Sequence, residues 1–403
     1  TLRRVHSDIQ RIDHIPDLRE MRVFMTQSEF PGYPVWVEIH VGRFLNNVRL
    51  VRQYLPKTCQ MILVLKSDAY GHGMLELAWA AQAAGLLGRI GIGTHEEARL
   101  LRQAGFDNPL LKLVPSLPDE LEESIELGIE ELVSDLTTAK RLSGIAQKYG
   151  REAKVHLCLD TGMGREGLLA EGRAVTQISE IAAQPMIQVV GLMTHFPEAD
   201  AQDKTFTLRQ IESFKNIRND LHLQGLRVGI CHAANSAAIL DLPESHMDAV
   251  RPGLVLYGMY PSVHVRRLQG IEPVMSFHTR IVLIRKIPAG YSVGYTRSYV
   301  APSDRVIATL PVGYNDGYFR ALSNRAEVLI RGRRAPVVGI VSMNLITVDV
   351  TEIPGVEVGD EVVLFGNQEA QALSADELGA WAGTINYEVT TRIGTRCHRY
   401  FIK

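Results

Sequence analysis

Short apolar runs alternate with segments of helical periodicity from about residue 36 to residue 258. Eight such runs occur: QMILVLKSD, RIGIGT, PLLKLVP, EELVSD, KVHLCLDTG, IQVVGLMTHF, RVGICHAAN and DAVRPGLVLYG. Amphipathic segments such as THEEARLLRQAGF and TTAKRLSGIAQKYG lie between them, and several end at glycine, a usual helix stop. Eight strands, most followed by a helix, predict an α/β fold with a closed (β/α)8 TIM-like barrel. The alternative, an open doubly wound sheet, lacks a GxGxxG after its first strand.

The pattern changes after about residue 272. Runs rich in β-branched residues, separated by Gly, Pro and Asp, follow one another: SFHTRIVLIRKI, DRVIATLPVG, AEVLIRG, APVVGIVSMNLITVDVT and DEVVLFG. Only SADELGAWAG reads as a helix. We therefore expect an N-terminal extension over 1–34, the barrel over 35–272 and a mostly-β domain over 273–403.

Composition narrows the class of protein. The chain has 403 residues, too many for one ordinary core, and 46% of them are hydrophobic. The formal net charge is −2 without a long basic run, so we expect neither a nucleic acid nor an anionic membrane as partner. Four cysteines lie far apart without a CxxC pair, which predicts neither a zinc site nor a disulfide framework. Isolated thiols favour the cytoplasm, although a periplasmic location stays open because the chain begins at Thr1.

Polar side chains collect where the predicted strands end. In a barrel the loops after the carboxyl ends of the strands carry the function. Read in order, these ends supply Lys66, Asp68 and Tyr70 after the first strand, Asp160, Thr161 and Arg165 after the fifth, Thr194 and His195 at the sixth, His232, Asn235 and Ser236 after the seventh, and Arg251 at the eighth.

This set of residues favours phosphate and amine chemistry. HExxH and GxSxG motifs are absent, so we expect neither a metal centre nor a serine hydrolase. Barrels often bind phosphate at the last two loops, where Ser236 and the backbone of Gly253 and Leu254 are available. A lysine across the barrel mouth from a phosphate site suggests bound pyridoxal phosphate. A phosphosugar enzyme with a covalently acting lysine would show a similar set.

Nine segments, taken together, resemble the alanine racemase family. VLKSDAYGHG, LDTGMGREG, MTHF, HAANSAA, VRPGLVLYG, SVGYTRSY, PVGYNDG, VSMN and GTINYEV occur in that family's order and approximate spacing, over about residues 35–403. The resemblance implies a barrel followed by a β domain, a pyridoxal phosphate cofactor and an amino-acid substrate. It also implies a head-to-tail homodimer, in which each active site is completed by the partner's β domain.

Matched by position, the resemblance assigns a role to each motif residue. Lys66 resembles the lysine that holds the cofactor and serves as one catalytic base, and Tyr295 resembles the second base, supplied by the other subunit. The phosphate cradle corresponds to Tyr70, Ser236 and Tyr387, with the backbone of Gly253 and Leu254.

The remaining roles concern the cofactor ring and the substrate. Arg251 resembles the arginine that faces the pyridine nitrogen, and His195 the histidine that orients it. Arg165 resembles the arginine near the cofactor's phenolic oxygen and the substrate carboxylate, although taken alone it could pair with Asp160 in a turn. A residue whose backbone amide touches the substrate carboxylate, and a tyrosine at the mouth of the site, correspond to Met343 and Tyr314.

Two positions depart from the family's pattern. Cys158 stands where many alanine racemases have a carbamate-bearing lysine that braces the active-site arginine, so chloride or water would have to fill the gap beside Arg165. Ser342 and Asn344, in VSMN, replace a common Cys-Met-Asp and are similar to broad-specificity racemases that accept lysine or arginine. DTGMGREG and Tyr387 resemble ordinary alanine racemases.

We therefore expect a two-base racemase that acts mainly on alanine and supplies D-alanine for peptidoglycan. The alternatives are a broad-specificity racemase for lysine, arginine or serine, and a non-catalytic barrel protein that binds pyridoxal phosphate.

Overall fold

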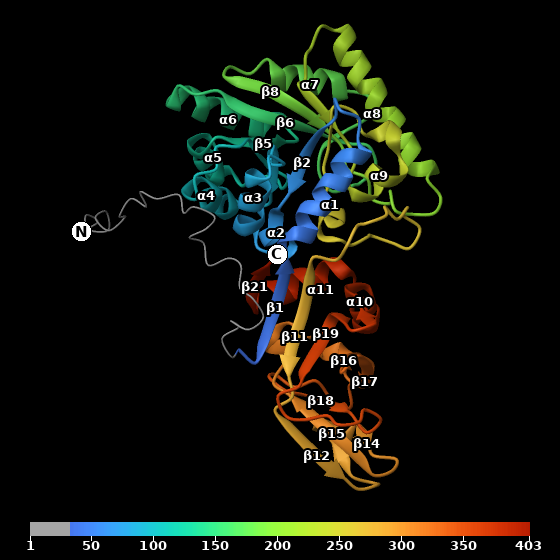
Figure 1. The fold of residues 1–403 in the computed structure, drawn as a ribbon. Coiled ribbons are helices and arrows are strands. Elements are labelled where there is room, and N and C mark those ends of the chain that lie inside the picture. Colours follow the sequence, from blue (N-terminus) through green and yellow to red (C-terminus); the bar gives the residue numbers. More distant parts are fainter. Residues whose placement is uncertain (1–32) are drawn as a thin grey trace, which may run out of the picture.

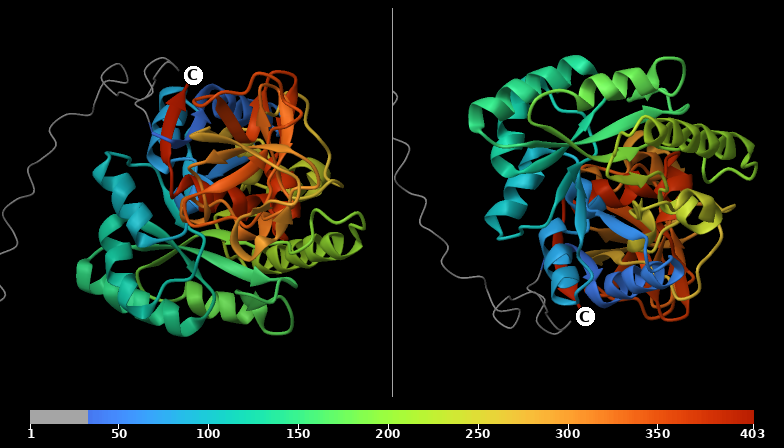
Figure 2. Two further views of the ribbon diagram at one scale, coloured as in Figure 1. Left: turned by 90° about the horizontal axis from the view of Figure 1, so that it is seen from below. Right: turned by 90° about the horizontal axis from the view of Figure 1, so that it is seen from above.

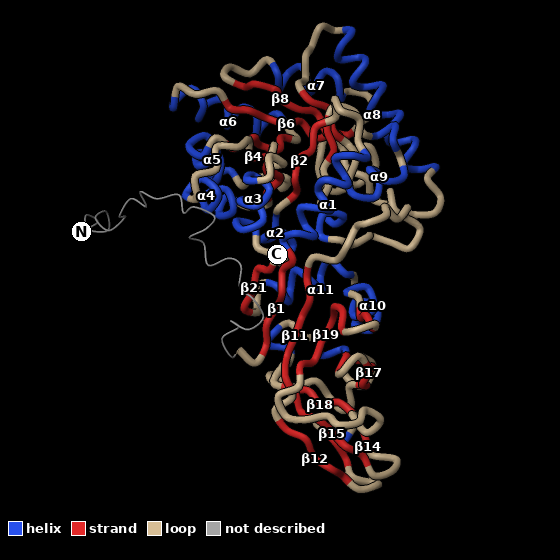
Figure 3. Tube along the Cα trace, in the orientation of Figure 1, coloured by secondary structure: helices blue, strands red, loops and turns tan. Residues whose placement is uncertain are grey.

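The computed structural model describes residues 33–403 and consists of two bodies joined end to end (Figure 1). Nearly all of the expected N-terminal extension, residues 1–32, lies outside the described residues. Helices surround the strands of the upper body, whereas the lower body is mainly strands with two helices near the junction (Figure 3). None of the described helices is long and apolar enough to cross a membrane.

The upper body is the predicted closed barrel, which confirms the fold class. Eight parallel strands pair in sequence, and the pairs β5–β6 and β10–β2 close the ring. Each strand overlaps one of the eight predicted runs: β2 (Gln60–Val64), β3 (Arg89–Ile92), β4 (Leu110–Lys112), β5 (Ile129–Val133), β6 (Ala153–Asp160), β8 (Ile187–Met193), β9 (Ile230–His232) and β10 (Ala249–Val250). A two-residue strand, β7 (Leu168–Leu169), pairs with the end of β6.

Helices cover the outside of the barrel (Figure 2). Their ends follow ordinary capping chemistry: in α6, Asp135 accepts the backbone amide of Thr138 at 2.8 Å, and Gly150 ends the helix in the left-handed conformation. The helices are α1 (Val41–Tyr54), α3 (Met74–Ala83), α4 (His95–Gln103), α5 (Leu121–Leu127), α6 (Leu136–Tyr149), α7 (Ala174–Ala182), α8 (Thr205–Leu223) and α9 (Ser236–Asp241), with a short turn, α2 (Lys66–Tyr70), after β2.

The lower body, which we call the β domain, is built on a sheet in the order β17-β16-β19-β11-β1-β21, with β20 paired to β19. Smaller sheets contain β12, β15 and β18, and β13 with β14. The strands are β11 (Met275–Arg280), β12 (Leu283–Ile287), β13 (Ser292–Val293), β14 (Tyr299–Val300), β15 (Arg305–Leu310), β16 (Glu327–Ile330), β17 (Arg333–Pro336), β18 (Ile346–Asp349), β19 (Glu361–Gln368), β20 (Gln371–Leu373) and β21 (His398–Ile402).

The first strand of the chain belongs to the β domain. β1 (Val35–His40) pairs antiparallel with β11 and parallel with β21. The range expected for the barrel, 35–272, thus begins with a strand that pairs in the β domain. The sequence could not show this, because the pattern of a strand does not reveal which strands it pairs with. One continuous hydrophobic cluster runs through both bodies, from Leu63 in the barrel to Phe277 and Val389 in the β domain.

The expectation of a single helix in the β domain is wrong. Besides α10 (Ala375–Ala382), the segment NYEVTTRIG forms α11 (Asn386–Gly394). Its β-branched residues have weak helix propensity, so tertiary packing decides its conformation. The helix lies directly against the α2 turn: a Cβ on Gly394 would be 2.0 Å from the carbonyl oxygen of Gly71.

We expect Gly394→Ala to lower the free energy of unfolding by about 1–3 kcal/mol or more, because the added methyl group forces α11 away from the barrel. Gly144→Ala is the matched control, since a Cβ at this exposed site in α6 meets no atom within 4 Å. The control should raise stability by about 0.5–1 kcal/mol through helix propensity. Thermal denaturation checks both, and equal melting temperatures for the two variants would contradict the close contact.

Candidate active site

Nine of the predicted residues line one cavity of about 220 Å³ at the carboxyl ends of the barrel strands. They are Lys66, Tyr70, Arg165, His195, Ser236, Arg251, Gly253, Leu254 and Tyr387. The wall also contains Val64, Leu113, Glu166, Met193 and Asn235. Two guanidinium groups, one lysine amine and one carboxylate face this space, so it suits an anionic ligand.

A left-handed turn places Lys66 and Tyr70 at the cavity. The four residues 67–70 have φ angles of 55°, 53°, 54° and 56°. Left-handed backbone costs about 1–2 kcal/mol for each L-residue, so contacts from outside the turn must stabilise it.

Two side chains from other elements hold this turn. Asp68 accepts the backbone amide of Met74 at 2.7 Å and forms an ion pair with Arg399 of β21. Arg399 also donates to the carbonyl of Gly71 at 3.1 Å. From α4, Glu97 accepts the backbone amide of Asp68 at 3.2 Å. The barrel and the β domain therefore both fix the position of Lys66.

The Lys66 amine lies in surroundings that disfavour its charge. Burial lowers its pKa, the nearby Arg165 guanidinium lowers it further, and the carboxylates of Glu166 and Glu97 oppose the shift. A lysine with a lowered pKa is more often the neutral amine that acts as nucleophile or base.

One end of the cavity presents neutral hydrogen-bond donors. The Ser236 hydroxyl oxygen accepts the amides of Gly253 at 3.1 Å and Val255 at 3.3 Å, which leaves its own hydrogen free to donate. Burial raises the pKa of the Tyr387 phenol to about 12 and also raises that of Tyr70, so both stay protonated. A Cβ on Gly253 would lie 2.6 Å from the Tyr70 hydroxyl, so the backbone can approach there only as glycine. These donors suit a phosphate group.

Arg251 is a buried cation held by neutral acceptors. Its Nη1 donates to the carbonyl and to Nδ1 of His232, at 2.9 and 2.7 Å. Its Nη2 donates to the carbonyls of Thr194 and Ala233, at 2.7 and 2.9 Å, and faces His195 Nδ1 at 3.3 Å. Burial lowers its pKa to about 10, which still leaves it charged at neutral pH. Since a guanidinium only donates, His195 and His232 must present bare Nδ1 atoms.

A chain of buried side chains continues from Arg251 through the barrel core. His232 Nε2 lies 2.8 Å from His156 Nδ1, and His156 Nε2 lies 2.9 Å from Glu130. Because Arg251 fixes the first tautomer, each histidine donates onward, and the chain ends at a carboxylate that also accepts Arg89 Nε at 2.7 Å. Burial opposes ionisation of Glu130, but these hydrogen bonds outweigh it and lower its pKa.

His156, Glu130 and Glu166 were not among the residues predicted for the site. Polar residues inside the runs EELVSD and KVHLCLDTG were a signal for the first two, but only the barrel's closure brings these strands together. The alternative pairing of Arg165 with Asp160 is wrong. Asp160 accepts backbone amides of residues 162–164, and Arg165 Nη2 lies 2.7 Å from Glu166 Oε1.

Tyr295, Met343 and Tyr314 do not line this cavity in the single chain. Tyr295 lies between β13 and β14 and is 67% exposed. Strand β14 lies at the end of the β domain away from the barrel (Figure 1). Met343 is 55% exposed. The amide of Tyr314 donates to Ser342 at 3.1 Å, so the loops that carry Tyr314 and Met343 lie side by side.

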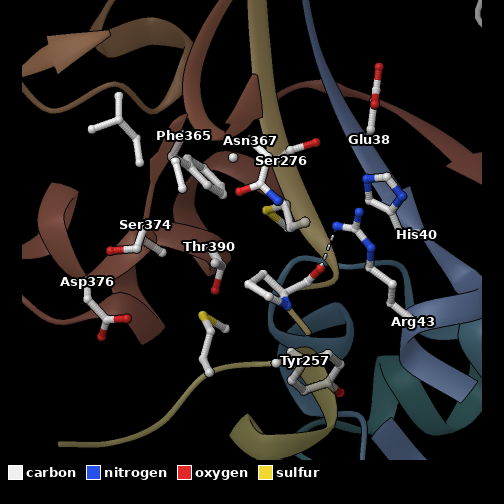
Figure 4. Close-up of a pocket in the computed structure, with 18 of the residues that line it drawn as sticks. Glu38, His40, Arg43, Tyr257, Ser276, Phe365, Asn367, Ser374, Asp376 and Thr390 are labelled. Carbon is white, nitrogen blue, oxygen red and sulfur yellow. Dashed lines mark hydrogen bonds between the residues drawn. The ribbon is translucent and has the colours of Figure 1, made fainter. Parts of the chain in front are cut away.

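A second cavity, of about 330 Å³, lies between the barrel and the β domain (Figure 4). None of the predicted site residues lines it. Several of its polar side chains already have partners within the chain: Arg43 donates to the carbonyl of Pro273 at 3.2 Å, and Glu377 accepts Arg334 at 2.9 Å. The cationic cavity is therefore the better candidate active site.

Buried neutral histidines should make stability depend on pH. Burial lowers the pKa of His72 and of His195 to about 3, and also lowers those of His156 and His232. In the unfolded chain histidine titrates near 6.5, so between these values the unfolded state binds more protons. The stabilisation is present above pH 6.5 and is lost as pH falls.

We expect the melting temperature to fall between pH 7 and pH 5, with proton uptake on unfolding measured by calorimetry in buffers of different ionisation enthalpy. Carboxyl groups, which titrate near pH 4, contribute little in this window. Unfolding without proton uptake at pH 5.5 would contradict the neutral histidines.

Comparison with known proteins agrees with this geometry. Residues 39–261 match the family model for the N-terminal domain of alanine racemase, and residues 274–401 match that for the C-terminal domain. The chain is 39% identical over 372 residues to an alanine racemase of Clostridium tetani, covering 92% of this chain and 96% of the relative. It is 40% identical over 368 residues to one of Halothermothrix orenii, covering 91% and 97%.

Solved structures give the same result. Alanine racemase of Clostridium difficile 630 superimposes with a TM-score of 0.87 at 33% identity, covering 93% of this chain and 97% of that one. The Bacillus anthracis enzyme with bound L-Ala-P gives 0.85 at 32% identity, covering 93% and 96%. With both family models matched in order and the predicted residues gathered at the barrel mouth, the chain belongs to the alanine racemase family.

Proposed function

We propose that this protein is a pyridoxal-phosphate-dependent racemase that interconverts L- and D-alanine and supplies D-alanine for peptidoglycan. The observation that carries the proposal is the cationic cavity. Lys66, Arg165, Arg251 and a cradle of neutral hydrogen-bond donors all line it. The family membership and the names of the relatives support alanine as the substrate.

The residues present fit the cofactor. Ser236, Tyr70 and Tyr387, with the backbone of Gly253 and Leu254, would hold its phosphate. The Gly253 amide, which donates to the Ser236 hydroxyl at 3.1 Å in this structure, would turn to the phosphate when the cofactor binds. The close approach that requires glycine at 253 is typical of a backbone that wraps an anion. When bound, pyridoxal phosphate withdraws electrons from the α-carbon of an amino acid and makes its proton acidic.

Racemisation needs a base on each face of the α-carbon, since the proton leaves one face and returns to the other. Lys66 Nζ would take or give the proton on one face, helped by its lowered pKa. Arg251 can only donate hydrogen bonds, so it would leave the ring nitrogen without a proton. Arg165 would hold the substrate carboxylate, and Met343 would contribute its backbone amide.

The second base would come from another copy of the chain. Tyr295 does not line the cavity of its own chain and is largely exposed on the β domain. A head-to-tail homodimer would place the partner's Tyr295 over Lys66, with Tyr314 at the mouth of the shared site. We expect a small amino acid, and neither nucleic acid nor membrane, as the binding partner besides this second subunit. All four cysteines are free thiols, which favours the cytoplasm.

Broad specificity is the second candidate, favoured by Ser342 and Asn344. Incubating the protein and pyridoxal phosphate with L-alanine, L-serine, L-lysine and L-arginine, followed by chiral chromatography, separates the two. We expect D-alanine to dominate. Comparable turnover of lysine or arginine would favour the broad-specificity racemase, and turnover of none would leave a non-catalytic cofactor-binding protein.

The shared site predicts complementation between two inactive variants. Lys66→Ala and Tyr295→Phe should each lose activity by orders of magnitude, because each removes one base. Mixed and allowed to exchange subunits, they should regain about a quarter of wild-type activity, since half of the dimers are mixed and each has one intact site. Mixing either variant with itself is the control, and no recovery despite exchange would contradict a shared site.

A further inference from the structure

A single carboxylate faces the cations of the active-site cavity. Of the described residues that line it, only Glu166 is acidic, beside Lys66, Arg165 and Arg251. Glu166 Oε1 accepts Arg165 Nη2 at 2.7 Å, a charge-assisted hydrogen bond. The Glu166 side chain is only 10% exposed, whereas that of Arg165 is 52% exposed. The arginine is therefore the more exposed member of the pair, and protein atoms surround most of the glutamate side chain.

The loop after β6 fixes the backbone of Glu166. Asp160 ends the strand and accepts three backbone amides, at 2.8 to 3.1 Å, from residues 162–164. The loop then returns to the strand at Gly167, whose φ is +116° and where a Cβ would lie 2.6 Å from the amide nitrogen of Asp160. The carbonyl of Glu166 lies 3.9 Å from Cys158 Sγ. The loop that carries Glu166 is thus held to the end of β6 on both sides of this residue.

Cys158 cannot supply the negative charge that a half-exposed arginine needs. Burial raises the pKa of its thiol to about 12, so it remains neutral at physiological pH. Without a carboxylate, Arg165 would face the Arg251 guanidinium, and this like charge would push its side chain toward solvent. The negative charge beside Arg165 therefore comes from a side chain of the protein itself, the Glu166 carboxylate.

We propose that Glu166 is a positioning residue that holds the Arg165 guanidinium in place to receive the substrate carboxylate. The inference rests on the proposed function, in which Arg165 binds that carboxylate. It predicts that the effect of Glu166 on carboxylate binding runs mainly through Arg165, so removing Glu166 should change that binding far less once Arg165 is absent.

A double-mutant cycle tests this coupling. Propionate, which has the carboxylate of alanine but no amine to react, serves as the probe, and its dissociation constant for the pyridoxal-phosphate-loaded protein is measured by ligand-observed NMR. We expect Glu166→Leu to raise it about five- to tenfold, as fits the loss of a charge-assisted hydrogen bond to a half-exposed group. Glu166→Gln, which keeps the acceptor oxygen, should raise it less. In the Arg165→Ala background, Glu166→Leu should change it less than twofold.

Kinetics give an independent measurement. Across the same variants, the KM for L-alanine should rise in the same order as the propionate dissociation constant, while kcat changes less. Glu171→Leu, an exposed acid in the following segment, is the matched control and should alter neither. Tighter propionate binding in Glu166→Leu, or an equal effect in the Arg165→Ala background, would overturn the positioning role. If the unmodified protein forms no D-alanine the proposed function fails, whereas an additive cycle in an active enzyme overturns this inference alone.

Discussion

The ion pair between Asp68 and Arg399 joins the turn after the first barrel strand to the last strand of the β domain. It fixes a left-handed turn that four L-residues would not adopt by themselves, and this turn places Lys66 and Tyr70 on one cavity. The last strand of the β domain and helix α11 hold the turn from one side, and Glu97 holds it from the other. The active-site lysine is therefore set by contacts between the two bodies and not by the barrel alone.

The other cations depend on the same kind of support. Arg251 is buried without a carboxylate, and carbonyls and neutral histidines satisfy its donors along a chain that ends at Glu130. Arg165 is half exposed and depends on Glu166. The cavity thus keeps an excess of positive charge for an anionic ligand. The hydrogen-bond partners of each arginine also fix the orientation of its guanidinium group. Away from bulk water, fixed charges of this kind act more strongly than they would in water.

Much of the fold could be predicted from the sequence because it depends on local patterns. The eight barrel strands follow from hydrophobic runs, and the order of the motifs identifies the family. Features set by tertiary contact could not be predicted. The pairing of β1 with β21 joins segments more than 350 residues apart, and α11 forms from residues with weak helix propensity. Glu166 was visible within DTGMGREG, but its pairing with Arg165 appears only once the loop is folded.

The most direct test of this account is to map where the cofactor attaches. The protein is loaded with pyridoxal phosphate, reduced with borohydride, digested and analysed by mass spectrometry. The account predicts a phosphopyridoxyl group on the peptide that contains Lys66, and its loss in a Lys66→Arg variant that still folds. A label mainly on another lysine, or an unlabelled Lys66 in protein that binds the cofactor, would contradict the claim that the left-handed turn exists to present this amine.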